Sequence, residues 1–121
     1  MNAKKRSIGF TYAWNGIIEA WKSERNFRSH ILSAFIVILA GIFFQLSVIE
    51  WIIIVFCIGF VIVTELLNTA IEKLLDYLKP DIHPKAKIIK DLSAGAVLIS
   101  ALCSAIVGLL IFLPKLYKLF L

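Results

Sequence analysis

Long runs of apolar residues divide this chain into segments typical of membrane-spanning helices. Residues 31–49 and residues 92–114 carry no charged side chain. Each run is long enough for a helix to cross about 30 Å of hydrocarbon. A middle block, residues 51–64, is too short alone, and it reaches this length only if its helix continues through Glu65. The pattern therefore predicts three spans, over about residues 31–49, 51–70 and 92–114.

The N-terminal segment has a different, amphipathic pattern. Its apolar side chains recur at helical spacing, with polar side chains between them, and the apolar set is Phe10, Trp14, Ile17, Ile18 and Trp21. Tryptophans on such a face favour a helix that lies in the membrane interface, while packing of this face on the bundle is an alternative that remains open. We expect a surface helix over about residues 8–28. Polar residues interrupt any continuous apolar core, so this segment is not expected to be a signal peptide.

Composition and charge placement agree with a membrane protein of a single all-α domain, residues 1–121. The chain is 60% hydrophobic and its net charge is +5; its mean hydropathy is +0.90. Most basic residues either precede the first span or lie between the second and third. The positive-inside rule then predicts a cytoplasmic N-terminus and an outside C-terminus, with Lys115 and Lys118 as minor exceptions. No separate basic domain exists, so nucleic acid is not an expected partner.

A stripe of polar residues continues from the middle apolar block. Glu65, Asn68, Glu72 and Asp76 fall at i, i+3, i+7 and i+11, so they share one face of a helix. Ionisable groups at the edge of a bilayer are costly and usually functional. Prolines and a charged run predict a loop after this helix, over about residues 80–90. The expected topology brings two further clusters to the same membrane face: Glu24 with Arg25 and Arg28, and Lys90 with Asp91.

These clusters alone leave more than one interpretation open. Carboxylates from different helices beside a lysine suit a magnesium-bound phosphate, because Mg²⁺ favours one or two carboxylates together with phosphate oxygens and water. A network of structural ion pairs is the alternative. A non-enzymatic channel or accessory subunit would need polar residues deep within the spans, where the sequence offers little beyond serines. His30 and His83 form no zinc-type pair, and each is expected to be structural or to mark a boundary.

Three motifs in order resemble the bacterial integral-membrane diacylglycerol kinase family, and the similarity covers nearly the whole chain. They are Ala20-Trp21-x-x-Glu24-x-x-Phe27-Arg28, Glu65-x-x-Asn68-Thr69-Ala70-Ile71-Glu72-x-x-x-Asp76 and Lys90-Asp91-x-x-Ala94-Gly95-Ala96-Val97. The resemblance implies a homotrimeric lipid kinase of the bacterial plasma membrane. Each subunit has a surface helix and three transmembrane helices, and the active sites lie between neighbouring subunits. The implied phosphoryl donor is ATP with Mg²⁺.

The resemblance also implies roles for individual residues. Glu65 matches the catalytic base, and Glu24 and Glu72 match the carboxylates that hold the metal of Mg-ATP. Further nucleotide-binding positions are Lys90, Asp91, Tyr12 and His83, and positions of substrate binding or support are Asn68, Arg28 and Asp76. These roles suit the spacing, because seven residues of helix separate Glu65 from Glu72 by roughly 10 Å along the axis. A base at the lipid boundary and a metal on the aqueous side are thus possible on one helix.

The lipid substrate follows from the branch of the family that the chain is most similar to. The segment Glu24-Arg25-Asn26-Phe27-Arg28-x-His30 looks more like the undecaprenol kinases than the diacylglycerol kinases. The latter tend to have an acidic residue where His30 stands and a serine where Ala94 stands. We therefore expect phosphorylation of undecaprenol to undecaprenyl phosphate, with diacylglycerol as the alternative substrate.

Overall fold

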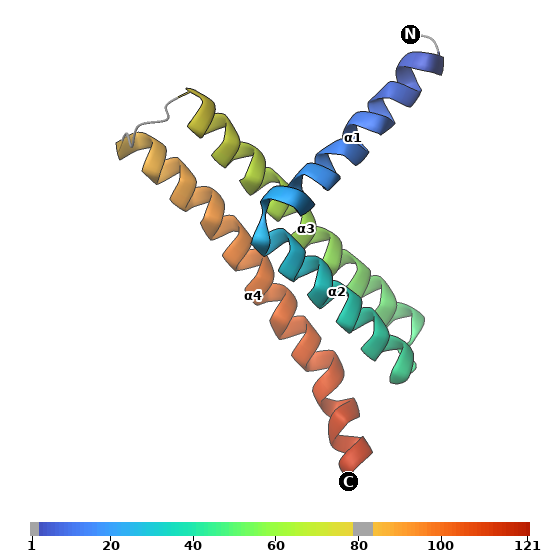
Figure 1. Cartoon of the computed structure of the whole chain (residues 1–121). Coiled ribbons are helices and arrows are strands. Elements are labelled where there is room, and N and C mark those ends of the chain that lie inside the picture. Colours follow the sequence, from blue (N-terminus) through green and yellow to red (C-terminus); the bar gives the residue numbers. More distant parts are fainter. Residues whose placement is uncertain (1–2, 79–83) are drawn as a thin grey trace.

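The computed structural model describes residues 3–78 and 84–121, and this part of the chain forms four helices (Figure 1). They are α1 (Ala3–Ser23), α2 (Arg25–Phe43), α3 (Val48–Leu78) and α4 (Pro84–Phe120). By length and composition, α2, α3 and α4 could each cross a membrane. The expected all-α fold with three long apolar helices is confirmed.

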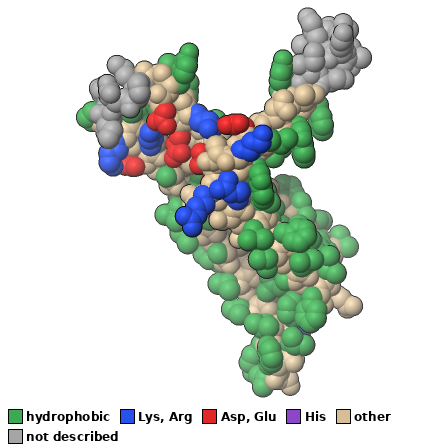
Figure 2. Space-filling model, in the orientation of Figure 1, with side chains coloured by type: hydrophobic (Ala, Val, Ile, Leu, Met, Phe, Trp, Pro, Cys, Tyr) green, Lys and Arg blue, Asp and Glu red, His purple; other side chains and the backbone are tan. Residues whose placement is uncertain are grey.

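The three long helices form an open bundle, and α1 leaves it at an angle. The α3 and α4 helices run antiparallel and side by side, while α2 packs along α3 (Figure 1). Most large apolar side chains of these helices point outward. In Figure 2 they cover the part of the molecule away from the charged groups. Such an apolar surface suits hydrocarbon or other apolar helices rather than water.

The first helix ends earlier than the amphipathic pattern predicts. Instead of continuing to residue 28, α1 stops at Ser23, because Glu24 adopts an extended conformation with φ −120° and ψ 112°. Arg28, now on α2, donates from Nη1 to the backbone oxygens of Trp21 at 2.6 Å and Lys22 at 3.2 Å. A cation at these otherwise unsatisfied carbonyls stabilises the end of α1. Residues 25–28 therefore belong to the first long helix.

The turn between α2 and α3 also begins earlier than the predicted span end at residue 49. Gln45 has a φ of 54°, and the amide of Leu46 donates to Gly41 O at 3.1 Å, the bond of a Schellman motif. On the other side of the turn, Ser47 and Glu50 form a reciprocal capping box, with bonds of 2.9 and 3.2 Å. These two motifs end α2 at Phe43 and begin α3 at Val48.

The expected loop before the third span is largely helical. The α4 helix begins at Pro84, so residues 84–90 are not a loop as predicted. Proline is well suited to the first turn of a helix, where its missing N–H needs no acceptor. The remaining residues of the predicted loop, 80–83, lie outside the described residues. Both α3 and α4 thus extend well beyond the predicted spans of 51–70 and 92–114.

Small and polar residues join α3 to α4 along their shared interface. Ser100 is fully buried, and its hydroxyl lies 2.8 Å from that of Thr64. Ser104 donates to the backbone oxygen of Cys57 at 3.3 Å. Small residues allow helices to approach closely, and their hydroxyls add interhelical hydrogen bonds. At the end of the bundle near the α2–α3 turn, Lys115 also pairs with Glu50 at 3.2 Å.

Candidate functional site

The centre of the site is a buried carboxylate between α2 and α3. Glu65 lies on α3 and is only 3% exposed. Its Oε1 is 3.1 Å from Nε2 of His30, which α2 carries towards it. A buried carboxylate needs such a partner, because burying an unpaired charge is very costly. The pair therefore holds the Glu65 carboxylate in place at the contact between α2 and α3.

Two further carboxylates lie close enough to Glu65 to interact with it electrostatically, those of Glu24 and Glu72. Glu24 occupies the break between α1 and α2, and Glu72 lies two turns further along α3. Neither side chain makes a hydrogen bond or ion pair with another described residue. Carboxylates held near each other without direct partners suit a bound cation. The role of Glu24 and Glu72 as metal ligands stays a prediction.

The described residues do not by themselves complete a metal site. Among them, no group of three or more histidine, cysteine, aspartate or glutamate residues is arranged to hold an ion. This is compatible with Mg²⁺, which binds through one or two carboxylates and takes its other ligands from substrate phosphates and water.

Two contacts from α4 extend the cluster along the stripe of α3. Lys90 donates to Oδ1 of Asp76 at 2.6 Å and also interacts electrostatically with Glu72. Ser93, one turn further along, donates to Oδ1 of Asn68 at 2.5 Å and is 8% exposed. Charged side chains of both signs gather at this end of the molecule (Figure 2). Side chains from two successive turns of α4 thus hold the polar stripe of α3.

Other predicted site residues are not brought to Glu65 within one chain. Asp91 forms an ion pair with Lys87 on α4 at 2.6 Å and is 63% exposed, whereas the neighbouring Lys90 faces α3. Tyr12 lies exposed on α1, which projects from the bundle. His83 lies outside the described residues. Arg28 contacts backbone oxygens of α1, so the contacts described for it are those of support.

Sequence reasoning missed three residues of this site. His30 and Ser93 contact Glu65 and Asn68 respectively. Thr69 lies one turn beyond Glu65, with a buried hydroxyl oxygen that has no hydrogen-bond partner among the described residues. His30 and Glu65 are far apart in the sequence, and no local spacing relates them. The only available signal was the difference between branches of the family at His30.

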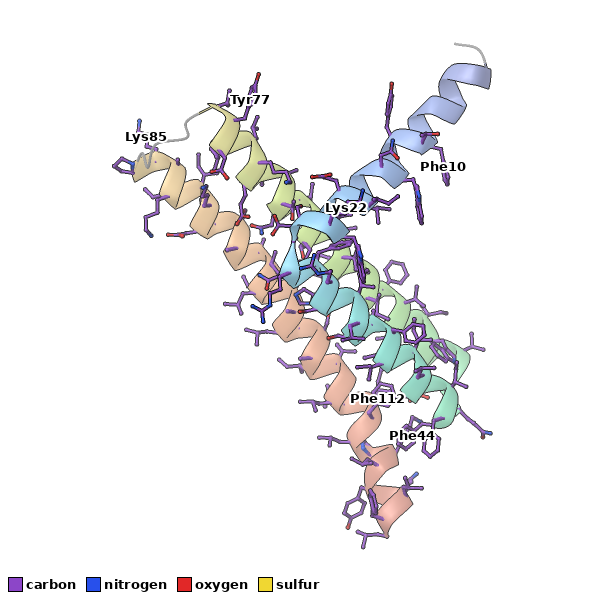
Figure 3. The ribbon with its side chains drawn as sticks, viewed as in Figure 1. Phe10, Lys22, Phe44, Tyr77, Lys85 and Phe112 are labelled. Atoms are coloured by element: carbon purple, nitrogen blue, oxygen red, sulfur yellow. The ribbon has the colours of Figure 1, made fainter. Side chains whose placement is uncertain are left out.

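An apolar groove of about 530 Å³ leads away from His30 between α2, α3 and α4. It runs past Ser33, Val37 and Ile58 and ends at Phe112. Figure 3 shows Phe112 beside Phe44, at the opposite end of the bundle from Tyr77 and Lys85. The charged cluster and the apolar groove therefore meet at the His30–Glu65 pair.

Comparison with known proteins assigns the chain to a family. The model of the prokaryotic diacylglycerol kinases matches residues 11–112. The chain belongs to this family. It is 50% identical to the undecaprenol kinase of Bacillus subtilis, over 88% of this chain and 87% of that protein. It is 39% identical to a diacylglycerol kinase of Synechocystis, over 93% of this chain and 65% of that protein. Identity to the diacylglycerol kinase of Escherichia coli is 26%, over 78% of each chain.

Family membership makes the protein a membrane lipid kinase of a bacterium, with ATP as its phosphoryl donor. Its relatives include both undecaprenol and diacylglycerol kinases, so the family alone leaves the lipid open. The three apolar helices agree with an enzyme whose acceptor is dissolved in the membrane.

Proposed function

We propose that the protein phosphorylates undecaprenol to undecaprenyl phosphate. The observation that carries this proposal is the 50% identity to the Bacillus subtilis undecaprenol kinase over most of both chains. Identity to the Escherichia coli diacylglycerol kinase is much lower, at 26%. The apolar groove lined by His30, the partner of Glu65, supports an acceptor that is mostly hydrocarbon. Diacylglycerol remains the second candidate, because the family includes relatives named for it.

The proposed chemistry assigns a part to each carboxylate of the cluster. The lipid hydroxyl oxygen forms a bond to the γ-phosphorus as the bond to the β–γ bridging oxygen breaks, and ADP leaves. Glu65 takes the hydroxyl proton, while Glu24 and Glu72 would hold Mg²⁺, which neutralises charge on the phosphates. Lys90, which interacts electrostatically with Glu72, would contact the nucleotide. Asn68, held by Ser93, orients groups between base and metal, and Asp76 holds Lys90.

We also propose that the active protein is a homotrimer whose sites lie between subunits. One chain leaves Asp91 and Tyr12 apart from Glu65, and a neighbouring subunit would supply such nucleotide contacts. His83 is a further candidate contact. The N-terminus is proposed to be cytoplasmic and the C-terminus outside, following the positive-inside rule. The ion pair with Glu50 lowers the free-energy cost of a positive charge on Lys115 at the proposed outer face of the membrane.

A direct lipid-preference assay tests the substrate. Purified protein in vesicles would receive radiolabelled ATP, Mg²⁺ and either undecaprenol or diacylglycerol at matched concentrations. We expect kcat/KM to be at least about tenfold higher for undecaprenol, which corresponds to about 1.4 kcal/mol of discrimination. A clear preference for diacylglycerol would overturn the proposed substrate and leave the kinase assignment intact.

A further inference from the structure

His30 occupies a position to which the proposed transfer assigns no role. Its Nε2 lies 3.1 Å from Oε1 of Glu65, and the imidazole is 27% exposed whereas the carboxylate is 3% exposed. The imidazole therefore lies between the buried carboxylate and the open groove. A donor in this position restricts the rotation of the carboxylate and selects one of its orientations.

Of the charged and titratable groups described around Glu65, His30 is the one that can orient its carboxylate. The nearby carboxylates of Glu24 and Glu72 have the same charge as Glu65 and would repel it. Two basic side chains of the neighbouring elements, Arg28 and Lys90, are engaged elsewhere. Arg28 binds the end of α1, and Lys90 binds Asp76. Within the described parts of the chain, His30 is the one side chain that bonds to Glu65.

The lining of the apolar groove also supports a role for His30. His30 lines its end, together with Ser33, and Ser104 lies further along it. The hydroxyl of Ser33 donates to the backbone oxygen of Ser29 at 2.9 Å, and that of Ser104 donates to Cys57 O at 3.3 Å. Because both serine protons are already used, His30 is the polar group of this lining that connects the groove to Glu65.

We propose that His30 is a positioning residue for phosphoryl transfer. Its imidazole holds the Glu65 carboxylate at the end of the apolar groove, where the hydroxyl of a long-chain lipid alcohol arrives. This inference rests on the proposed function of Glu65 as base. It adds that the alignment of the base depends on a residue of α2.

Three substitutions test this role through steady-state kinetics with an isoprenoid alcohol and Mg-ATP in vesicles. His30→Leu removes the donor, whereas His30→Gln keeps an N–H donor at a similar reach. We expect His30→Leu to lower kcat about 10²-fold, the effect of misaligning a reacting group, with KM for Mg-ATP almost unchanged. His30→Gln should recover at least about tenfold of this loss. Ser29→Ala, on the same helix at an exposed position, is the matched control and should leave kcat unchanged.

A double substitution separates positioning through Glu65 from a general effect on the fold. If His30 acts through Glu65, adding His30→Leu to Glu65→Gln should cause no further loss. The proposal would be overturned if the two losses of kcat multiplied in the double variant. It would also be overturned by a wild-type kcat in His30→Leu, or by no recovery of kcat in His30→Gln. Unaltered transfer by Glu65→Gln alone would instead refute the base that the proposal depends on. Circular dichroism and size-exclusion chromatography of each variant identify any that misfold, and His30→Gln then decides the outcome.

Discussion

Glu65 is a buried carboxylate on an apolar helix, and it is the residue that we propose as the base. It is almost fully buried, its carboxylate is held by His30, and an apolar groove begins at the same place. A carboxylate in this environment can take a proton from a lipid alcohol whose chain stays in hydrocarbon. The charged groups that follow along α3 and α4 are more exposed and suit contact with a water-borne nucleotide.

Replacing Glu65 with Gln tests its proposed part as base. The amide keeps the shape of the side chain but cannot accept the proton, so kcat should fall by about 10²–10⁴-fold. Assembly and ATP binding should persist, measured by size-exclusion chromatography and by nucleotide binding in the presence of Mg²⁺. Glu19→Gln is a suitable control, because the Glu19 carboxylate is exposed and its ion pair with Lys73 is long, at 3.8 Å. Unchanged turnover in the Glu65→Gln protein would remove this residue as the base.

Replacing Glu72 with Gln tests the metal site separately from the base. Losing one charged ligand costs about 1.5–3 kcal/mol. The Mg²⁺ concentration for half-maximal transfer should therefore rise about tenfold or more. A titration of Mg²⁺ at fixed ATP measures this change, and Asp76→Asn provides a comparison on the same helix face. An unaltered metal requirement would contradict the proposed part of Glu72.

At the scale of elements, periodicity predicted the existence of every helix but not all of their ends. The apolar runs and the amphipathic N-terminal pattern are confirmed as helices. The break at Glu24 was missed, because it depends on Arg28 reaching back to the carbonyls of α1. The start of α3 had a readable signal, the Ser47-x-x-Glu50 capping box. The prolines predict a loop at Pro84, but the first turn of a helix accepts proline equally well, and α4 begins there.

The contact between α2 and α3 depends on a glycine. A Cβ added at Gly41 would lie 2.6 Å from Cη2 of Trp51 and 3.0 Å from Cδ1 of Leu46. Gly41→Ala should therefore destabilise the bundle by about 1–3 kcal/mol through overpacking. Gly59→Ala is the matched control, because nothing lies within 4 Å of the added Cβ and alanine favours a helix. Thermal unfolding of both variants in one detergent measures the difference, and equal stabilities would refute this packing.

At the scale of the whole molecule, one chain presents most of its apolar surface outward and separates Asp91 from Glu65. Both features support an oligomer in which neighbours cover one another and complete each other's sites. A three-helix bundle of this size has little interior in which to enclose ATP and a lipid head together. The proposed trimer would use cyclic symmetry, so each interface repeats the same composite site.

Mixing two inactive variants tests whether sites are shared between subunits. Asp91→Asn and Glu65→Gln proteins would be unfolded, mixed in equal amounts and refolded together. If neighbouring subunits supply these residues to one site, random mixing restores up to about one quarter of wild-type activity, because that fraction of interfaces is intact. Each variant refolded alone is the control and should stay inactive. No recovery in the mixture would place both residues in the same subunit's site.

The amino-acid sequence by itself determined that this protein lies in a membrane and which segments of it form helices. Apolar runs of sufficient length predict helices in a membrane, and the spacing of Glu65, Asn68, Glu72 and Asp76 places them on one face. Only the tertiary structure decided which groups meet across helices. The pairs of Glu65 with His30, Asn68 with Ser93 and Asp76 with Lys90 join residues distant in sequence. Helical periodicity fixes the direction of a side chain on its own helix, whereas these contacts depend on how the helices cross and on their register.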